Sequence, residues 1–161
     1  MSERKLYAAY GSNMNLSQMA QRCPHAKRVG RGLVYGYELV FAYKGVATIV
    51  PSPDNFVIVI LWELTPECEQ ALDRYEGYPR LYGKEKIQVS LMDSDMEVSA
   101  MAYVMNKPFC EMRDIPSESY KNTILIGLKQ NDIQIKKEVQ YADQSKGKLC
   151  FDRQADQSHN V

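Results

Sequence analysis

"LYAAYGSNMN", residues 6–15, decides the fold prediction because it joins a strand pattern to a helix pattern through a glycine. Residues 5–10 predict a strand, and apolar side chains at i, i+3, i+4 and i+7 predict a short helix over 16–23. Asn15 is suited to cap that helix. Gly11 reaches backbone conformations closed to other residues, so the N–H groups after it can converge on one oxygen or carboxylate. The loop is therefore a candidate ligand site, and an ordinary turn is the alternative.

Short β-like segments follow between residues 29 and 62, and we expect Gly45 and "PSPDN" at 51–55 to break them. A helix is predicted from Thr65, its N-cap, to a stop at Gly77.

Two further strands are predicted near 82–92 and 97–105, and a turn around "DSDM" predicts that they form a hairpin. Ser117 or a neighbouring residue can cap a last helix, which presents one apolar face. This order of elements indicates an α+β domain with a curved, partly closed sheet. We expect a single domain over residues 1–148 and a polar C-terminal tail over 149–161.

Composition limits the function classes. Twenty Lys plus Arg balance twenty Asp plus Glu, which argues against nucleic acid or an anionic membrane as a partner. The longest apolar run, at 56–62, is far too short to span a bilayer, and the first residues do not resemble a secretory signal. We therefore expect a cytoplasmic protein. The four cysteines form no C-x-x-C pair and there are two histidines, so no metal site is predicted.

Glu76 is the first candidate catalytic residue. It falls in the last turn of the helix that starts after Thr65, where the helix dipole disfavours a negative charge. Enclosure there would raise its pKa, as a general base working near neutral pH requires. The alternative is a solvated terminal glutamate. A carboxylate-pair hydrolase would need a second buried acid, for which Glu63, Asp73 and Glu85 are available.

The eleven tyrosines are the second candidate group, because tyrosine offers an apolar wall with a hydroxyl that can orient a polar ligand. Core or rim positions with satisfied hydroxyls are the alternative. Those in or next to predicted elements are Tyr7, Tyr10, Tyr82, Tyr103 and Tyr120.

Five stretches together resemble the γ-glutamylcyclotransferase family, which includes the avirulence-induced-gene-like proteins. The resemblance covers roughly residues 6–135, and its most specific parts are the Tyr-Gly-Ser-Asn loop and the Glu-Gly after a helix. In order, the stretches are "LYAAYGSNM", "GVATIVPSP", "LDRYEGYPRLY", "AYVM" and "SESYKNTILIGLKQN".

This resemblance implies a small mixed β-barrel with surrounding helices and a cofactor-free reaction that forms 5-oxoproline from a γ-glutamyl compound. Glu76 would be the general acid and base. Backbone donors of the loop would hold the glutamyl moiety, and four tyrosines would line the pocket. The implied substrate-binding residues are Tyr7, Tyr10, Gly11, Ser12, Asn13, Tyr82, Tyr103 and Tyr120.

Two questions stay open at this point. The leaving group could be an amino acid, a lysine isopeptide or another amine, and the oligomeric state has no sequence signal. A non-catalytic module that keeps the same pocket for a small ligand is the alternative function.

Overall fold

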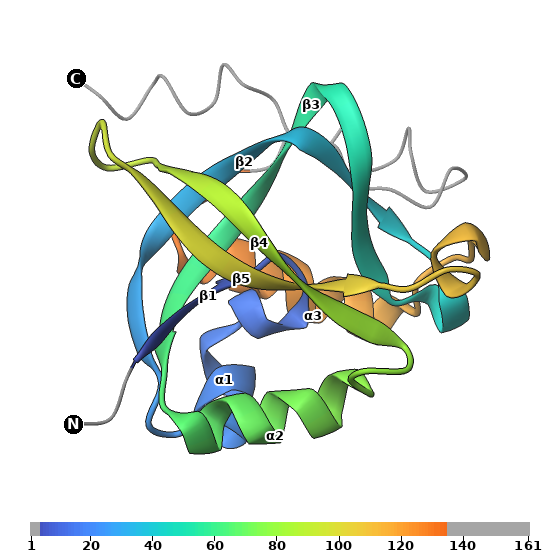
Figure 1. The fold of residues 1–161 in the computed structure, drawn as a ribbon, viewed down its shortest axis with the longest axis horizontal. Coiled ribbons are helices and arrows are strands. Elements are labelled where there is room, and N and C mark those ends of the chain that lie inside the picture. Colours follow the sequence, from blue (N-terminus) through green and yellow to red (C-terminus); the bar gives the residue numbers. More distant parts are fainter. Residues whose placement is uncertain (1–3, 135–161) are drawn as a thin grey trace.

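The computed structural model describes residues 4–134, and a closed five-stranded barrel is its central feature (Figure 1). The boundary expected at 148 and the polar tail lie outside the described residues. The strands are β1 (Lys5–Ala9), β2 (Lys27–Phe41), β3 (Ala47–Leu64), β4 (Tyr82–Leu91) and β5 (Glu97–Met105).

Three α-helices and three 3₁₀ turns surround the barrel. In Figure 1, α1 and α2 lie side by side below the barrel, and α3 lies behind it. Their bounds are α1 (Leu16–Arg22), α2 (Pro66–Glu76), α3 (Glu118–Gln130), η1 (Ser12–Met14), η2 (Tyr43–Gly45) and η3 (Phe109–Glu111). Within residues 4–134, no helix is long and apolar enough to cross a membrane.

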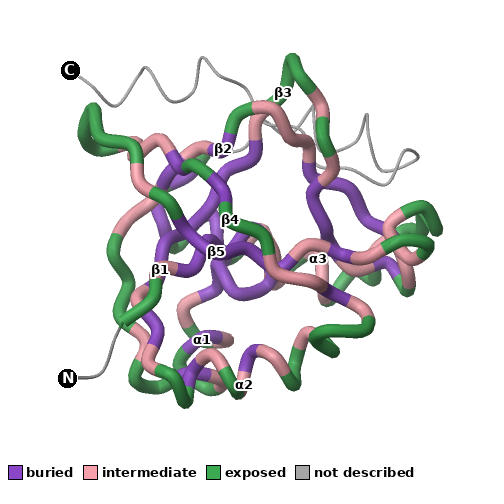
Figure 2. Tube along the Cα trace, in the orientation of Figure 1, coloured by how far each residue is buried: buried purple, intermediate pink, exposed green. Residues whose placement is uncertain are grey.

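The strand order around the barrel is β1-β3-β2-β4-β5. Neighbouring strands are antiparallel except β1 and β5, which run parallel and close the barrel at the pair Tyr7–Met101. The expected α+β class with a mixed barrel is confirmed, and the sheet is closed rather than partly closed. Burial is concentrated where the strands wrap around the core, as Figure 2 shows.

One expected break is wrong. "PSPDN" does not end a strand, because β3 continues through it from Ala47 to Leu64. Its pairing with β2 changes register here: Pro51 is opposite Tyr37, whereas Phe56 is opposite Tyr35. The residues between are accommodated as an irregularity in the ladder, and Gly36 opposite them has a φ of +84°. A bulge therefore absorbs residues that favour a turn.

The predicted helix caps are confirmed. The Asn15 side chain accepts a hydrogen bond from Gln18 N, Thr65 from Cys68 N, and Ser117 from Tyr120 N. Helix α2 ends at Gly77 in the left-handed conformation, with a φ of +63°. The position of Glu76 as the last residue of α2 follows from this local stop signal.

Helix α3 packs against the loop after β1. An added Cβ on Gly127 would lie 2.7 Å from Asn15 N, so only glycine lets the helix approach this closely. Asn15 Nδ2 donates to Thr123 O at 3.1 Å, and Asn131 Nδ2 donates to Met14 O at 3.0 Å. The loop is thus held against a helix that lies more than a hundred residues away in the sequence.

Candidate active site

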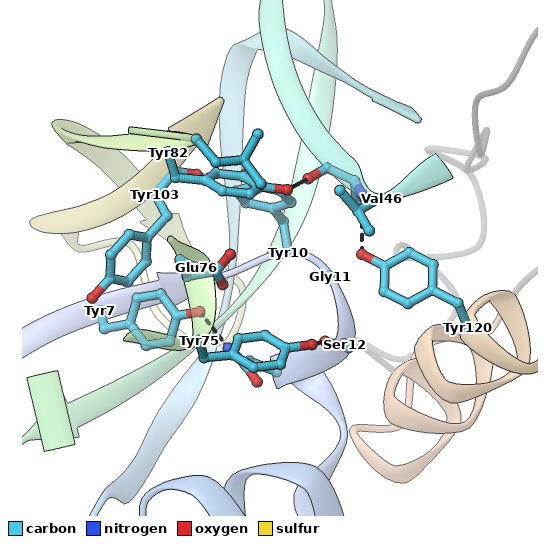
Figure 3. Close-up of a pocket in the computed structure, with 13 residues that line it drawn as sticks. Tyr7, Tyr10, Gly11, Ser12, Val46, Tyr75, Glu76, Tyr82, Tyr103 and Tyr120 are labelled. Carbon is cyan, nitrogen blue, oxygen red and sulfur yellow. Dashed lines mark hydrogen bonds between the residues drawn. The ribbon is translucent and has the colours of Figure 1, made fainter. Parts of the chain in front are cut away.

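A cavity of about 200 Å³ opens where the loop after β1 meets the end of α2, the start of β4 and the end of β5. Figure 3 shows the Glu76 carboxylate in the middle of the surrounding residues, with tyrosine rings around it. All nine residues implied by the family resemblance lie in the lining. The complete lining is Tyr7, Tyr10, Gly11, Ser12, Asn13, Val46, Ala47, Tyr75, Glu76, Leu81, Tyr82, Tyr103 and Tyr120.

Asn13 fixes the shape of the loop. Its side chain is 3% exposed and bonded at both ends: Arg22 Nη1 donates to Oδ1 at 2.5 Å, and Nδ2 donates to Tyr7 Oη at 3.0 Å. Trp62 Nε1 donates to its backbone carbonyl at 3.1 Å. These bonds satisfy the buried amide from three different elements, so the loop has one well-defined conformation.

The loop presents free backbone donors. In the part of the chain that the structure describes, the N–H groups of Gly11, Ser12 and Asn13 donate to no protein acceptor, whereas the next two amides close the 3₁₀ turn. Successive unpaired N–H groups favour a carboxylate or a developing oxyanion. The loop is therefore suited to bind an oxygen atom of a ligand.

Glu76 supplies a carboxylate with an unusual pKa. Burial in the cavity raises the pKa of its carboxyl to about 7, and the nearby Arg22 guanidinium acts in the opposite direction. Among residues 4–134, no hydrogen bond or ion pair engages this carboxylate. At neutral pH the group is thus close to half ionised and can both accept and donate a proton.

Three of the tyrosine hydroxyls anchor backbone around the cavity. Tyr82 Oη donates to Ala47 O at 2.5 Å, while Tyr120 Oη accepts from Ala47 N at 3.0 Å (Figure 3). Tyr10 Oη donates to Tyr103 O. The hydroxyls thus hold the start of β3 and the end of β5 in place, and the rings form walls of the cavity.

Burial raises the pKa of the five predicted tyrosines, Tyr7, Tyr10, Tyr82, Tyr103 and Tyr120, well above the ordinary value. All five stay neutral at physiological pH. Glu76 is therefore the lining residue that can exchange a proton near pH 7.

Sequence reasoning did not single out Tyr75 and Arg22. Tyr75 lines the mouth, with its hydroxyl 3.3 Å from Ser12 Oγ and its ring 3.7 Å from the Arg22 guanidinium carbon. Tyr75 lies next to Glu76, inside the stretch "LDRYEGYPRLY" that resembles the family, but no spacing marks Arg22. Its role appears only when α1 packs beside α2.

Among residues 4–134, Glu76 is not joined in the cavity lining by a second acid. Of the three acids considered for such a pair, Glu63 bonds Arg4, Glu85 is exposed, and Asp73 accepts from Tyr103 Oη at 2.6 Å outside the lining. The carboxylate-pair arrangement is therefore contradicted, and Glu76 is the acid of the lining.

Residues 4–134 contain no group of three or more His, Cys, Asp or Glu side chains arranged to hold a metal ion. Cys23, Cys68 and Cys110 are free thiols.

Known proteins resemble this chain in sequence and in fold. Curated gamma-glutamylcyclotransferases from Bos taurus and Mus musculus are 27% and 28% identical over 143 and 142 residues, with 81% of this chain and 73% of each relative covered. A solved structure titled gamma-glutamyl cyclotransferase is 22% identical with a TM-score of 0.73, and covers 97% of this chain and 98% of its own. A crystal structure of a human protein described as uncharacterized is 23% identical with a TM-score of 0.75, and 99% of both chains is covered.

The structural likenesses show a shared fold. The family model described as "Gamma-glutamyl cyclotransferase, AIG2-like" matches residues 7–122, which include the loop, Glu76 and all the pocket tyrosines. The chain belongs to the gamma-glutamyl cyclotransferase, AIG2-like family.

Proposed function

We propose that the protein is a γ-glutamylcyclotransferase that converts a γ-glutamyl amide into 5-oxoproline and a free amine or amino acid, without a cofactor. The observation that carries this proposal is the Glu76 carboxyl, whose pKa of about 7 arises in a cavity next to three unpaired backbone N–H groups.

Ring closure is intramolecular, so the protein's first task is to fold the substrate. The α-amine of the glutamyl moiety must approach its own γ-carbonyl carbon, and a cavity with fixed walls favours that conformer. The N–H groups of Gly11, Ser12 and Asn13 bind oxygen atoms of the glutamyl moiety. The rings of Tyr7 and Tyr103 restrict its aliphatic chain.

Glu76 then moves the protons. Its carboxylate accepts a proton from the α-ammonium, and the free amine attacks the γ-carbonyl carbon to form a tetrahedral adduct with a negative oxygen. The new C–N bond closes the five-membered ring. A pKa near 7 suits this step because the base is ionised in a large fraction of molecules at neutral pH.

Collapse of the adduct breaks the original amide bond. The protonated Glu76 gives its proton to the leaving nitrogen, so the amine departs neutral and not as an anion. The Glu76 carboxylate then takes the second proton from the ring nitrogen and passes it to the released amine, which becomes an ammonium ion, so the two protons lost by the α-ammonium equal the two gained by the leaving nitrogen. One carboxyl therefore serves both halves of the reaction.

The leaving group lies toward the mouth, where Tyr75 and Leu81 form part of the lining. Tyr75 is 47% exposed, so this end of the cavity is open to groups of different size. The identity of the released amine is best determined by assay.

The test is incubation of wild type and Glu76→Gln with γ-glutamyl amino acids, γ-glutamyl-ε-lysine and simple γ-glutamyl amines, with 5-oxoproline measured by mass spectrometry. Product from the wild type alone supports both the reaction and the base. Equal product from Glu76→Gln contradicts the role of Glu76. No product from either folded protein, together with lasting thermal stabilisation by a γ-glutamyl compound, favours a non-catalytic binding module.

A further inference from the structure

A polar network outside the cavity connects the helix that carries Glu76 to the barrel wall. Asp73 lies one turn before Glu76 on α2, and its Oδ1 accepts a hydrogen bond from Tyr103 Oη at 2.6 Å. Lys84 Nζ on β4 lies 2.9 Å from the same Oδ1 and 2.7 Å from Glu69 Oε2. One lysine thus bridges two carboxylates that are four residues apart on α2.

The network is partly shielded from water. The side chains of Lys84, Glu69 and Asp73 are 21%, 18% and 26% exposed. Burial alone would lower the pKa of Lys84, but its hydrogen bonds to the two carboxylates outweigh this and raise it. The lysine is therefore charged at neutral pH, and these bonds are stronger than those of an ordinary surface pair.

Tyr103 connects this network to the cavity lining. Its ring packs edge-to-face against Tyr7, with centroids 5.7 Å apart, and against Tyr78 at 6.5 Å. The ring lines the cavity while the hydroxyl faces Asp73. Helix α2 and this wall of the cavity are consequently joined by one hydrogen bond.

The position of Glu76 depends on such anchors. Within the described residues its carboxylate has no hydrogen-bond partner, and directly after it the chain turns away at Gly77. Leu72 and Cys68 fix the middle of α2 by burial. In the last turn, Asp73 accepts the hydrogen bond from Tyr103 on the barrel. On the opposite side of the turn, the Tyr75 ring packs against the Arg22 guanidinium of α1.

We infer that Asp73 and Lys84 are positioning residues, which set the distance between the Tyr103 wall and the last turn of α2 so that Glu76 meets the substrate amine. This inference rests on the proposed cyclisation. It assigns a role in the reaction to two side chains that lie outside the cavity lining. Misplacement of a catalytic group by a fraction of an ångström slows the chemical step and leaves binding largely intact.

The test compares kcat and KM of Asp73→Asn, Tyr103→Phe and the double variant. Asp73→Asn keeps the size of the side chain and removes its charge, and Tyr103→Phe keeps the ring and removes the hydroxyl. We expect each to lower kcat about 10-fold with KM within about twofold, and the double variant to match the singles because Asp73→Asn weakens and Tyr103→Phe removes the same hydrogen bond. Multiplied losses, about 100-fold in the double variant, would contradict a shared link.

Lysine variants separate positioning from general stability. Lys84→Met should lower kcat as Asp73→Asn does. Lys84→Arg should keep at least about half of the wild-type kcat, because it retains the positive charge. Lys5→Met is the matched control, since Lys5 also bonds Glu69, at 3.0 Å, but its side chain is 52% exposed and it meets the helix nearer its start. Its kcat should stay within about twofold of wild type.

The outcomes also separate this inference from the proposed function. If the wild type forms 5-oxoproline and Asp73→Asn keeps wild-type kcat, or loses only unfolding free energy, the inference alone is overturned. If the wild type forms no 5-oxoproline from any γ-glutamyl compound, the proposed function fails and the inference fails with it.

Discussion

Asn13 in the loop after β1 and Glu76 in the last turn of α2 line the same cavity, but their side chains are bonded in opposite ways. Asn13 is hydrogen-bonded to Arg22, Tyr7 and Trp62, and both polar atoms of its side chain have a partner. In the last turn of α2, the Glu76 carboxylate has no hydrogen-bond partner among the described residues.

This difference separates two tasks. Groups that bind a substrate gain from a fixed arrangement, because little conformational entropy remains to be lost on binding. A group that exchanges protons gains from burial without a strong partner, since a salt bridge would lower its pKa and leave it a weak base. The following changes test this division, from the largest expected effect to the smallest.

Replacing Glu76 should have the largest effect. Glu76→Gln keeps the shape of the side chain and removes its ability to exchange a proton, so we expect kcat to fall by about 10²- to 10⁴-fold. Steady-state kinetics of 5-oxoproline release measures this. Glu67→Gln, an exposed glutamate in the first turn of the same helix, is the matched control and should stay within about twofold.

Breaking the loop should affect binding more than proton transfer. Asn13→Ala removes the acceptor of Arg22 and the donor to Tyr7, so the loop loses its fixed shape and we expect kcat/KM to fall about 10- to 100-fold, mostly through KM. Substrate-dependent kinetics separates the two parameters. Asn55→Ala on the exposed irregular part of β3 is the control, and a fall in kcat alone would contradict the division.

A larger residue at position 127 of α3 tests the close contact between this helix and the loop. An alanine Cβ at position 127 would lie 2.7 Å from Asn15 N and 2.9 Å from Asn15 Cα, and backbone cannot move aside easily. We expect Gly127→Ala to lower the free energy of unfolding by about 1–3 kcal/mol in urea titration. Gly30→Ala, where no atom lies within 4 Å, should change it by less than about 0.5 kcal/mol.

The last prediction concerns stability and not activity, and the difference at Glu76 depends on pH. Its carboxyl has a folded-state pKa of about 7 against an ordinary value of 4.5, so the folded state binds the extra proton and stability falls as pH rises between these values. Glu76→Gln should therefore equal the wild type near pH 4 and exceed it by about 3 kcal/mol above pH 8. If the wild type and Glu76→Gln have equal unfolding free energies at both pH values, burial does not perturb the pKa of this carboxyl.

Local signals explain how much of the fold could be predicted. Asn15, Thr65 and Ser117 cap the helices they were expected to cap, because capping depends on the few residues that follow each of them. Gly77 ends α2 for the same reason. The wrong break at "PSPDN" depended on tertiary structure: pairing with β2 on both sides carries β3 through residues that favour a turn.

The site shows the same limit. The loop and Glu76 were predicted from motifs that are contiguous in the sequence, and the barrel brings them to one cavity. Arg22 and the Lys84–Asp73 link were not, because an arginine at a helix end and a lysine on a strand have no distinctive spacing. Their contacts exist only because α1 packs beside α2 and α2 packs on β4 and β5.

The pH dependence of kcat/KM for a γ-glutamyl substrate tests the central claim most directly, namely that the enclosed Glu76 carboxyl transfers the protons of cyclisation. In the wild type, kcat/KM should rise with pH with a midpoint near 7, the pKa of this carboxyl in the unliganded protein, and the residual activity of Glu76→Gln should lack that rise. A wild-type profile that is flat across this range, or the same midpoint in Glu76→Gln, would contradict the account.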